Sequence, residues 1–268
     1  MVQFVIKSNG QKEVYKKEKI IQSLQKLNIE EEKINEILWE IENKLPQIVS
    51  TKKLFDFIFT YLKDKELEYS YKYNLKQAIF KLGPAGYPFE KFIAHLLRFY
   101  DYRTKHNLFL KGKCLVYEID FLAEKDNFIY IGECKFHQHP WKINDIKVVL
   151  YSYARFLDIM KEDKEHLWVV TNTRFTTEVY KFAECYNIKL LSWNFPEENL
   201  PYLIDNKKAY PLTIFDFLPL KAIQKFFSYD IVLIQDIIKK EKSYLKKISG
   251  LDEMMIEKMF DIINGLIN

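Results

Sequence analysis

Three polar residues interrupt two otherwise apolar segments near the middle of the chain. Asp120 ends the segment 117–120, and Glu133 and Lys135 lie at the end of the segment 129–135. A β-strand turns successive side chains to opposite faces, so Glu133 and Lys135 would share a face, and a hairpin would bring Asp120 beside them. Two converging carboxylates repel each other unless a cation lies between them, and their hard oxygens favour Mg²⁺ or Mn²⁺. The spacing therefore predicts a divalent metal site.

The same residues indicate the chemistry of that site. Asp120 and Glu133 are the expected metal ligands, and the backbone carbonyl of Cys134 is a candidate third oxygen. Lys135 would orient or deprotonate a water, which suits hydrolysis of a phosphodiester. The alternative is a Glu-Lys pair on a solvated strand with an unrelated Asp nearby, because such pairs are common on sheets.

The elements around these residues have a recognisable order. Residues 86–97 predict a helix with an apolar stripe and Glu90 in its first turn, three strands follow, and a helix is expected over 144–160. A strand, a helix and a further strand over 167–193 would form a parallel crossover.

Over residues 83–193 this order resembles the restriction-endonuclease-like PD-(D/E)xK fold, and more narrowly its Mrr-like branch. The pattern is present as Phe89-Glu90, Ile119-Asp120 and Glu133-Cys134-Lys135, with Ile119 in place of the proline. The resemblance implies that Asp120 and Glu133 bind metal, that Lys135 is the catalytic lysine, and that Glu90 reaches the site directly or through a water.

Candidate DNA contacts follow the catalytic lysine. Lys147, Tyr151 and Arg155 are four residues apart and share a helical face. That face could meet DNA, or it could be a solvated basic stripe, which is the interpretation favoured for Arg155. His137 stands where relatives often have Gln, and it could touch phosphate or metal, or be a hydrogen-bonded supporting group. Residues 171–174 could contact phosphate, although polar strand ends occur in any α/β fold.

A separate module precedes the nuclease-like region. Residues 4–15 alternate like a hairpin with an Asn9-Gly10 turn, and helices are expected from residue 16 and over 31–44 and 51–63. This order resembles the ATP-cone over about residues 1–73, which implies binding of ATP or dATP.

The residues carried over from the ATP-cone are Lys7 and Lys19 as phosphate contacts, with Glu13 and Thr51 as less certain base or sugar contacts. Ser8 departs from the arginine that the family commonly has. The alternative is a module that has lost nucleotide binding and serves as an interaction or DNA-docking domain. A P-loop is absent from the sequence, so a Walker-type ATPase is not expected.

The expected organisation is therefore mixed α/β. We expect an ATP-cone of small α+β type over 1–80, a nuclease domain with an αβββαβ core over 81–200, and a helical region over 201–268. Helices at 231–238, 243–248 and 252–263 flank Gly250 like a helix-hairpin-helix, or form a small bundle for protein contacts.

Composition is compatible with this organisation. The net charge of +4 and the pI near 8.6 permit nucleic-acid binding without demanding it, and a long basic tail is absent. Three scattered cysteines favour a reducing cytoplasm. Neither a signal peptide nor a membrane-spanning run is evident, so no membrane partner is expected.

We interpret the sequence as a cytoplasmic, metal-dependent DNA endonuclease that hydrolyses phosphodiester bonds and is regulated by an adenine nucleotide. A homodimer is a further possibility, because nucleases with one site per chain often dimerise to cut both strands. The alternative function is a non-catalytic, nucleotide-responsive DNA-binding regulator that retains the nuclease fold.

Overall fold

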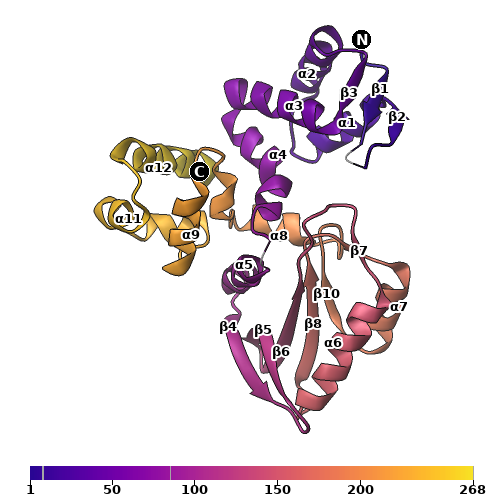
Figure 1. The fold of residues 1–268 in the computed structure, drawn as a ribbon, viewed down its shortest axis with the longest axis vertical. Helices are drawn as coiled ribbons and strands as arrows, with labels where there is room; N and C mark the ends of the chain where they lie inside the picture. Colours follow the sequence, from indigo (N-terminus) through magenta and orange to yellow (C-terminus); the bar gives the residue numbers. More distant parts are fainter. Residues whose placement is uncertain (8, 85, 268) are drawn as a thin grey trace. The chain divides into compact units, whose positions relative to one another are not determined.

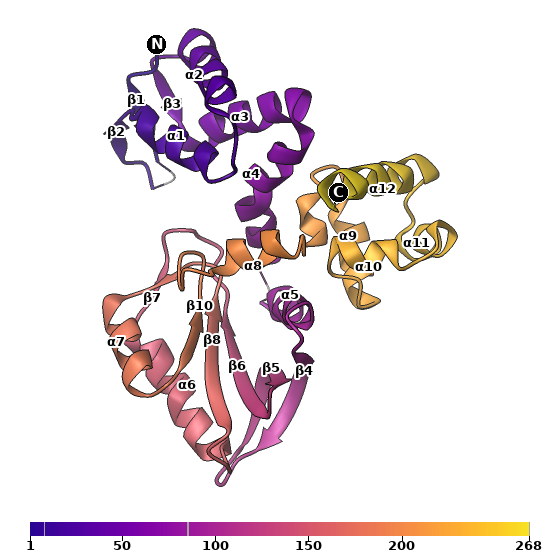
Figure 2. The same cartoon turned by 180° about the vertical axis from the view of Figure 1, so that it is seen from behind.

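The computed structural model describes all residues except Ser8, Ala85 and Asn268. The chain forms two compact units, Met1–Lys76 and Gln77–Asn268 (Figures 1 and 2). Among the described residues no helix is both long enough and apolar enough to cross a bilayer.

The first unit is a small α+β module. Its three strands lie in the order β2-β1-β3, with β1 antiparallel to β2 and parallel to β3. The elements are β1 (Phe4–Ile6), β2 (Lys12–Val14), α1 (Lys17–Gln25), α2 (Glu31–Lys44), β3 (Ile48–Ser50) and α3 (Thr51–Lys65). A further helix, α4 (Leu67–Phe80), continues beyond the end of this unit. The predicted hairpin is present, and Gly10 has the positive φ of 83° that its turn requires.

The second unit is organised around a five-stranded sheet in the order β10-β8-β6-β5-β4. β4 (Arg103–Lys111), β5 (Val116–Lys125) and β6 (Phe128–Lys135) form an antiparallel meander. β8 (Glu165–Thr171) and β10 (Lys189–Leu191) extend the sheet in parallel, as the predicted crossover requires. A separate two-stranded ladder pairs β7 (Ile143–Asn144) with β9 (Arg174–Phe175).

Helices cover both faces of this sheet (Figure 1). On one face, α6 (Ile146–Ile159) and α7 (Thr177–Cys185) bury an apolar core that includes Val149, Leu167, Val169 and Val179. On the other, α5 (Tyr87–Arg98) packs against β4 and β5 and buries Phe89 and Phe92 completely. The order of α5, three antiparallel strands, α6 and a parallel strand matches the predicted αβββαβ core.

The outer strand β4 is long and alternates in exposure. Arg103, Lys105 and Lys111 are exposed along it, and Asn107 at its centre has a φ of 53°. The unpaired edge of this strand is therefore basic and irregular.

The C-terminal helices belong to the same compact unit as the sheet. They are α8 (Leu200–Asn206), α9 (Leu220–Ser228), α10 (Ile234–Ile238), α11 (Lys242–Ser249) and α12 (Glu253–Ile267), with a 3₁₀ turn at Leu212–Ile214. The last three agree with prediction, whereas α8 lies in a segment for which no helix is predicted. Pro201 lies in the first turn of α8, where its missing N–H is tolerated, and Asn199 caps that helix.

Candidate active site

The middle of β5 and the end of β6 bring the three predicted polar residues together, and β5 continues past Asp120 to Lys125. Phe121 lies opposite Gly132, so Asp120 and Glu133 follow at neighbouring positions on the two strands. The Asp120 carboxylate accepts a hydrogen bond of 2.6 Å from the backbone N–H of Cys134. Lys135 Nζ lies 2.6 Å from Glu133 Oε1. The side chains of Asp120, Glu133 and Lys135 therefore converge at one end of the sheet.

A glycine immediately before Glu133 allows this close approach. A Cβ atom at Gly132 would lie 2.3 Å from the ring of Phe121, well inside van der Waals contact. Only a residue without a side chain lets the fully buried Phe121 ring pack over β6 at this point.

Glu90 adds a fourth carboxyl from the first turn of α5. Burial, together with the charges of Asp120, Glu118 and Glu133, raises the pKa of Glu90 to about 7. Burial, with the charge of Glu133, likewise raises the pKa of Asp120 to about 6. Partly buried carboxyls that crowd together in this way take up protons at a higher pH than usual, and a bound cation would favour their ionised forms. The donor set therefore fits a divalent metal ion bound by oxygen ligands.

Arg155 is a site residue that sequence reasoning missed. Its Nη1 lies 3.2 and 3.0 Å from the two carboxylate oxygens of Glu133, and its Nη2 donates to the backbone carbonyl of Glu118. The side chain is only 17% exposed. The expectation of a solvated Arg155 is wrong, because the turn of α6 points it at the end of the sheet. The four-residue spacing identified its helical face but contained no signal for its partner.

A buried hydrogen-bonded chain lies behind Lys135. Thr171 Oγ1 donates to the Lys135 carbonyl at 2.7 Å, Asn144 Nδ2 donates to Thr171 Oγ1 at 2.9 Å, and the His137 ring meets Asn144 Oδ1 at 2.9 Å. Asn172 completes the arrangement by bonding both the N–H and the carbonyl of His137. Thr171 and Asn172 are fully buried, so these strand-end residues support β6 from inside and do not face solvent as a phosphate contact would.

The remaining candidates in this unit lie around the site. Lys147 and Tyr151 are exposed on α6, and the Tyr151 ring lies 5.7 Å from the Arg155 guanidinium. Burial raises the pKa of the Cys134 thiol well above its ordinary value, so this sulfur is not a thiolate ligand. Metal binding by the Cys134 carbonyl, and DNA contacts by Lys147, Tyr151 and His137, stay predictions.

The candidate nucleotide residues cluster in the first unit. Glu13 accepts from Lys7 and lies 3.4 Å from Lys19 Nζ, and the Lys7 hydrogen bond, with the charges of both lysines, lowers the pKa of Glu13. Ser50 pairs with Ile6, so Thr51 at the start of α3 and Lys7 follow the same end of the sheet. Ser8 lies outside the described residues.

A separate hollow in this unit is chemically unsuited to nucleotides. It has a volume of about 810 Å³ and is lined by the carboxylates of Glu31, Glu32, Glu36 and Glu40 together with Trp39. Its negative charge would repel a triphosphate. The nucleotide residues inferred from sequence are not among its lining residues.

Comparisons with known proteins agree with the two-part organisation. Residues 3–79 match the ATP cone domain, and residues 85–194 match the restriction endonuclease family with the Mrr-type catalytic domain. An uncharacterized protein of Archaeoglobus fulgidus is 36% identical over 157 residues, which are 58% of this chain and 89% of that protein.

Two solved structures are similar to parts of the chain. The crystal structure of AF1548, a protein of unknown function, aligns with a TM-score of 0.58 at 33% identity, over 67% of this chain and 95% of that one. MspJI restriction endonuclease, in complex with a 27-mer oligonucleotide, aligns over 46% of this chain and 29% of its own with a TM-score of 0.34 and 17% identity, and nothing is inferred from that weak likeness.

Proposed function

The chain belongs to the restriction endonuclease family with the Mrr-type catalytic domain, here preceded by an ATP cone, and from this premise we propose that it is a metal-dependent DNA endonuclease. The observation that carries the proposal is the crowding of Glu90, Asp120 and Glu133 at the end of the sheet, beside Lys135. Such a set of carboxyls with an adjacent lysine suits hydrolysis of a phosphodiester.

In the proposed site, Asp120 and Glu133 hold the metal ion, which is Mg²⁺ or Mn²⁺. When bound, the cation supplies Lewis acidity that polarises the scissile phosphate and makes a water acidic. Glu90 joins the site directly or through a water, and the Cys134 carbonyl is a candidate further ligand.

The protein residues supply orientation and charge. Lys135 aligns the attacking water or stabilises the negative charge that develops on the phosphate. The hydrogen bond from Thr171 fixes the backbone of Lys135, and the buried Asn144 fixes the Thr171 hydroxyl. The Lys135 side chain therefore extends from a rigid backbone, which limits the positions that its ammonium group can take. Arg155 forms an ion pair with Glu133. That ion pair would weaken when a metal ion binds the Glu133 carboxylate.

We propose that DNA approaches the exposed side of α6. Lys147 there offers a positive charge to the phosphate backbone, and Tyr151 offers an aromatic face. His137 is a further candidate at the loop that follows the catalytic strand.

For the first unit we propose regulation by ATP or dATP. The ammonium groups of Lys7 and Lys19 would leave Glu13 and pair with the phosphates, and Thr51 at the start of α3 is a candidate contact to the sugar or base. Release of Glu13 would leave its carboxylate free to contact the sugar or base.

The nuclease proposal is tested by cleavage of plasmid and linear DNA with Mg²⁺, Mn²⁺ or EDTA. We expect metal-dependent cutting by the wild type, and its loss in Asp120→Asn and Lys135→Ala. Lys161→Ala, which changes an exposed lysine after the end of α6, is the matched control and should cut normally. DNA binding without cutting in every condition would replace the endonuclease with the non-catalytic regulator.

The regulatory proposal is tested on the same substrates with and without ATP or dATP, together with direct titration of the nucleotide. Lys7→Ala and Lys19→Ala should each weaken nucleotide binding about ten- to hundredfold, the loss of one charge-assisted hydrogen bond. Lys26→Ala, an exposed lysine at the end of α1, is the control. Tight nucleotide binding that leaves the cleavage rate unchanged would refute regulation while keeping the binding site.

A further inference from the structure

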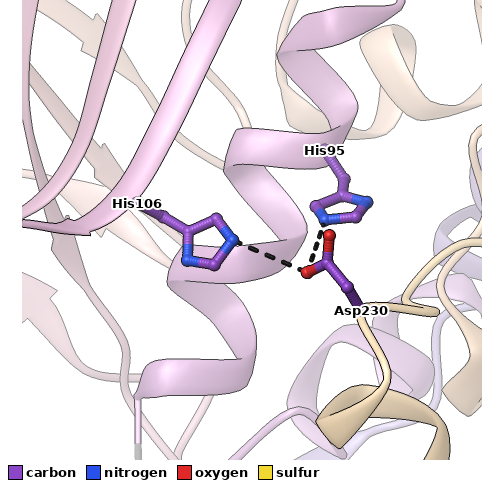
Figure 3. A group of neighbouring side chains, drawn as sticks. All are labelled: His95, His106 and Asp230. Atoms are coloured by element: carbon purple, nitrogen blue, oxygen red, sulfur yellow. Dashed lines mark hydrogen bonds and ion pairs between the residues drawn. The ribbon is translucent and has the colours of Figure 1, made fainter.

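A cluster of charged and titratable side chains, buried on its α5 side, joins α5 to the C-terminal helices. His95 of α5, His106 of β4 and Asp230, which follows α9, place their polar atoms within 4.8 Å of one another (Figure 3). Asp230 Oδ1 lies 3.2 Å from His95 Nε2 and 3.6 Å from His106 Nε2. His95 is only 4% exposed, whereas the Asp230 side chain is 51% exposed, so the contact is buried on the α5 side and open to solvent on the side of Asp230.

A lysine next to Glu90 completes the cluster. Lys91 is 5% exposed, and its Nζ lies 2.9 Å from Asp230 Oδ1 and donates to the Phe227 carbonyl at 2.7 Å. A buried ammonium is costly unless it is paired, and the carboxylate and the carbonyl that pair with Lys91 both come from the C-terminal segment. Two consecutive residues of α5 therefore have different surroundings. Glu90 lies near the active-site carboxyls, whose charges raise its pKa, and Lys91 pairs with groups at and just after the end of α9.

The C-terminal partners are themselves fixed. Asp236 Oδ2 lies 3.3 Å from His95 Nδ1 and also accepts from the backbone N–H groups of Val232 and Leu233 at 3.0 and 2.9 Å. Asp230 has a φ of 60°, the left-handed conformation in which helices commonly end and which aspartate tolerates. The segment from Ile231 to Ile234 is buried, which anchors both aspartates.

A metal ion is a poorer explanation of this cluster. Lys91 already supplies a positive charge to the Asp230 oxygen that a metal would need, and Arg98 Nη1 lies 3.3 Å from His95 Nε2. Two neighbouring cations would repel a divalent ion. The arrangement therefore works as an ion-paired clamp without metal.

We infer that the segment between α9 and α10 braces α5 and thereby sets the position of Glu90 in the nuclease site. Lys91, His95, Asp230 and Asp236 are accordingly positioning residues, and the C-terminal helices are part of the working nuclease. This inference rests on the proposed function, because Glu90 matters only if the carboxyl cluster binds metal.

The test uses the full chain and compares two ways of weakening the C-terminal helices. Asp230→Asn removes the charge that holds Lys91 and His95 but tolerates the left-handed backbone. Leu266→Ala removes a buried contact in α12 and destabilises the same region without touching α5. Asp252→Asn, a change of the same chemistry at the cap of α12, is the neutral control.

Three readouts separate a positioning role from general instability. For Asp230→Asn we expect a ten- to hundredfold lower kcat, a KM for DNA within about twofold of wild type, and a higher Mg²⁺ requirement. Amide hydrogen exchange in residues 87–98 should rise in Asp230→Asn and stay normal in Leu266→Ala at matched temperature below unfolding. Lys91→Arg should restore activity that Lys91→Met loses.

Specific outcomes would overturn the inference. Equal losses of kcat in Asp230→Asn and Leu266→Ala would mean that the clamp contributes stability alone. Stoichiometric zinc in the purified protein, lost in His106→Asn, would replace the ion-paired clamp with a metal site. If the wild type cuts no DNA, the proposed function fails. The brace is then judged by Ca²⁺ affinity and by exchange in α5, and no effect of Asp230→Asn on either would refute it.

Discussion

Metal binding by the carboxyl cluster should depend steeply on pH. The pKa of Asp120 is raised to about 6 and that of Glu90 to about 7. In mildly acidic solution both carboxyls are therefore largely protonated, and the protons must dissociate before a cation can bind the carboxylate oxygens. Lowering the solution from about pH 7 to about pH 5 reduces the ionised fraction of Asp120 from about 90% to about 10%. Metal affinity should then fall about tenfold, and several hundredfold if Glu90 must also ionise. An aspartate of ordinary pKa would change affinity by under about 10% over the same range.

The assay is calorimetric titration of the full chain with Ca²⁺ or Mg²⁺ in the absence of DNA, so the result does not depend on cleavage. Buffers with different ionisation heats report how many protons are released, and we expect about one near pH 6.5. Glu90→Gln should retain only the tenfold part of the dependence, and Asp120→Asn should bind no metal. An affinity that is constant over this range, with no proton released, would refute the assignment of protonated carboxyls to the metal-free site.

Further expectations concern stability in the absence of metal. Arg155→Met should lower the free energy of unfolding by about 2–3 kcal/mol, because Glu133 loses one of its two partners, and saturating Mg²⁺ should shrink the loss in a denaturant titration. Gly132→Ala should cost about 1–3 kcal/mol by overpacking, whereas Gly265→Ala in open space should stabilise by up to about 1 kcal/mol in the same titration. A raised pKa at Asp120 contributes stability that is fully present below its ordinary value of 3.8 and is lost as the pH rises through about 6. The free energy of unfolding of the wild type relative to Asp120→Asn should therefore decline by on the order of 2 kcal/mol between about pH 4 and pH 7, measured by denaturant titration.

Local patterns in the sequence were sufficient for most of the fold. The helix over 31–44 was predicted with the bounds that α2 has, since its apolar spacing is regular and Pro46 ends it. The polar residues Asp120, Glu133 and Lys135 were identified because they break apolar strands at positions that pairing brings together. The three-residue strand β3 was not predicted, because so few residues cannot display a period.

The parts that sequence could not provide are contacts between distant segments. Arg155 meets Glu133 across 22 positions, and Lys91 meets Phe227 across 136, and neither pair has a local signature. Both contacts depend on where α5 and α6 settle on the sheet, which is decided by packing. The chemical roles of these residues remain predictions for the experiments above.

The irregular outer strand β4 has a consequence for self-association. A nine-residue strand with one free side is a template on which another extended chain could add, and flat, apolar examples lead to aggregation. Here a second copy approaching that border would set Arg103, Lys105 and Lys111 against its own basic side chains, and the left-handed Asn107 would interrupt the ladder of hydrogen bonds. A continuous sheet formed by pairing β4 of two copies is therefore disfavoured, and any dimer that cuts both DNA strands would have to form through a surface other than this edge.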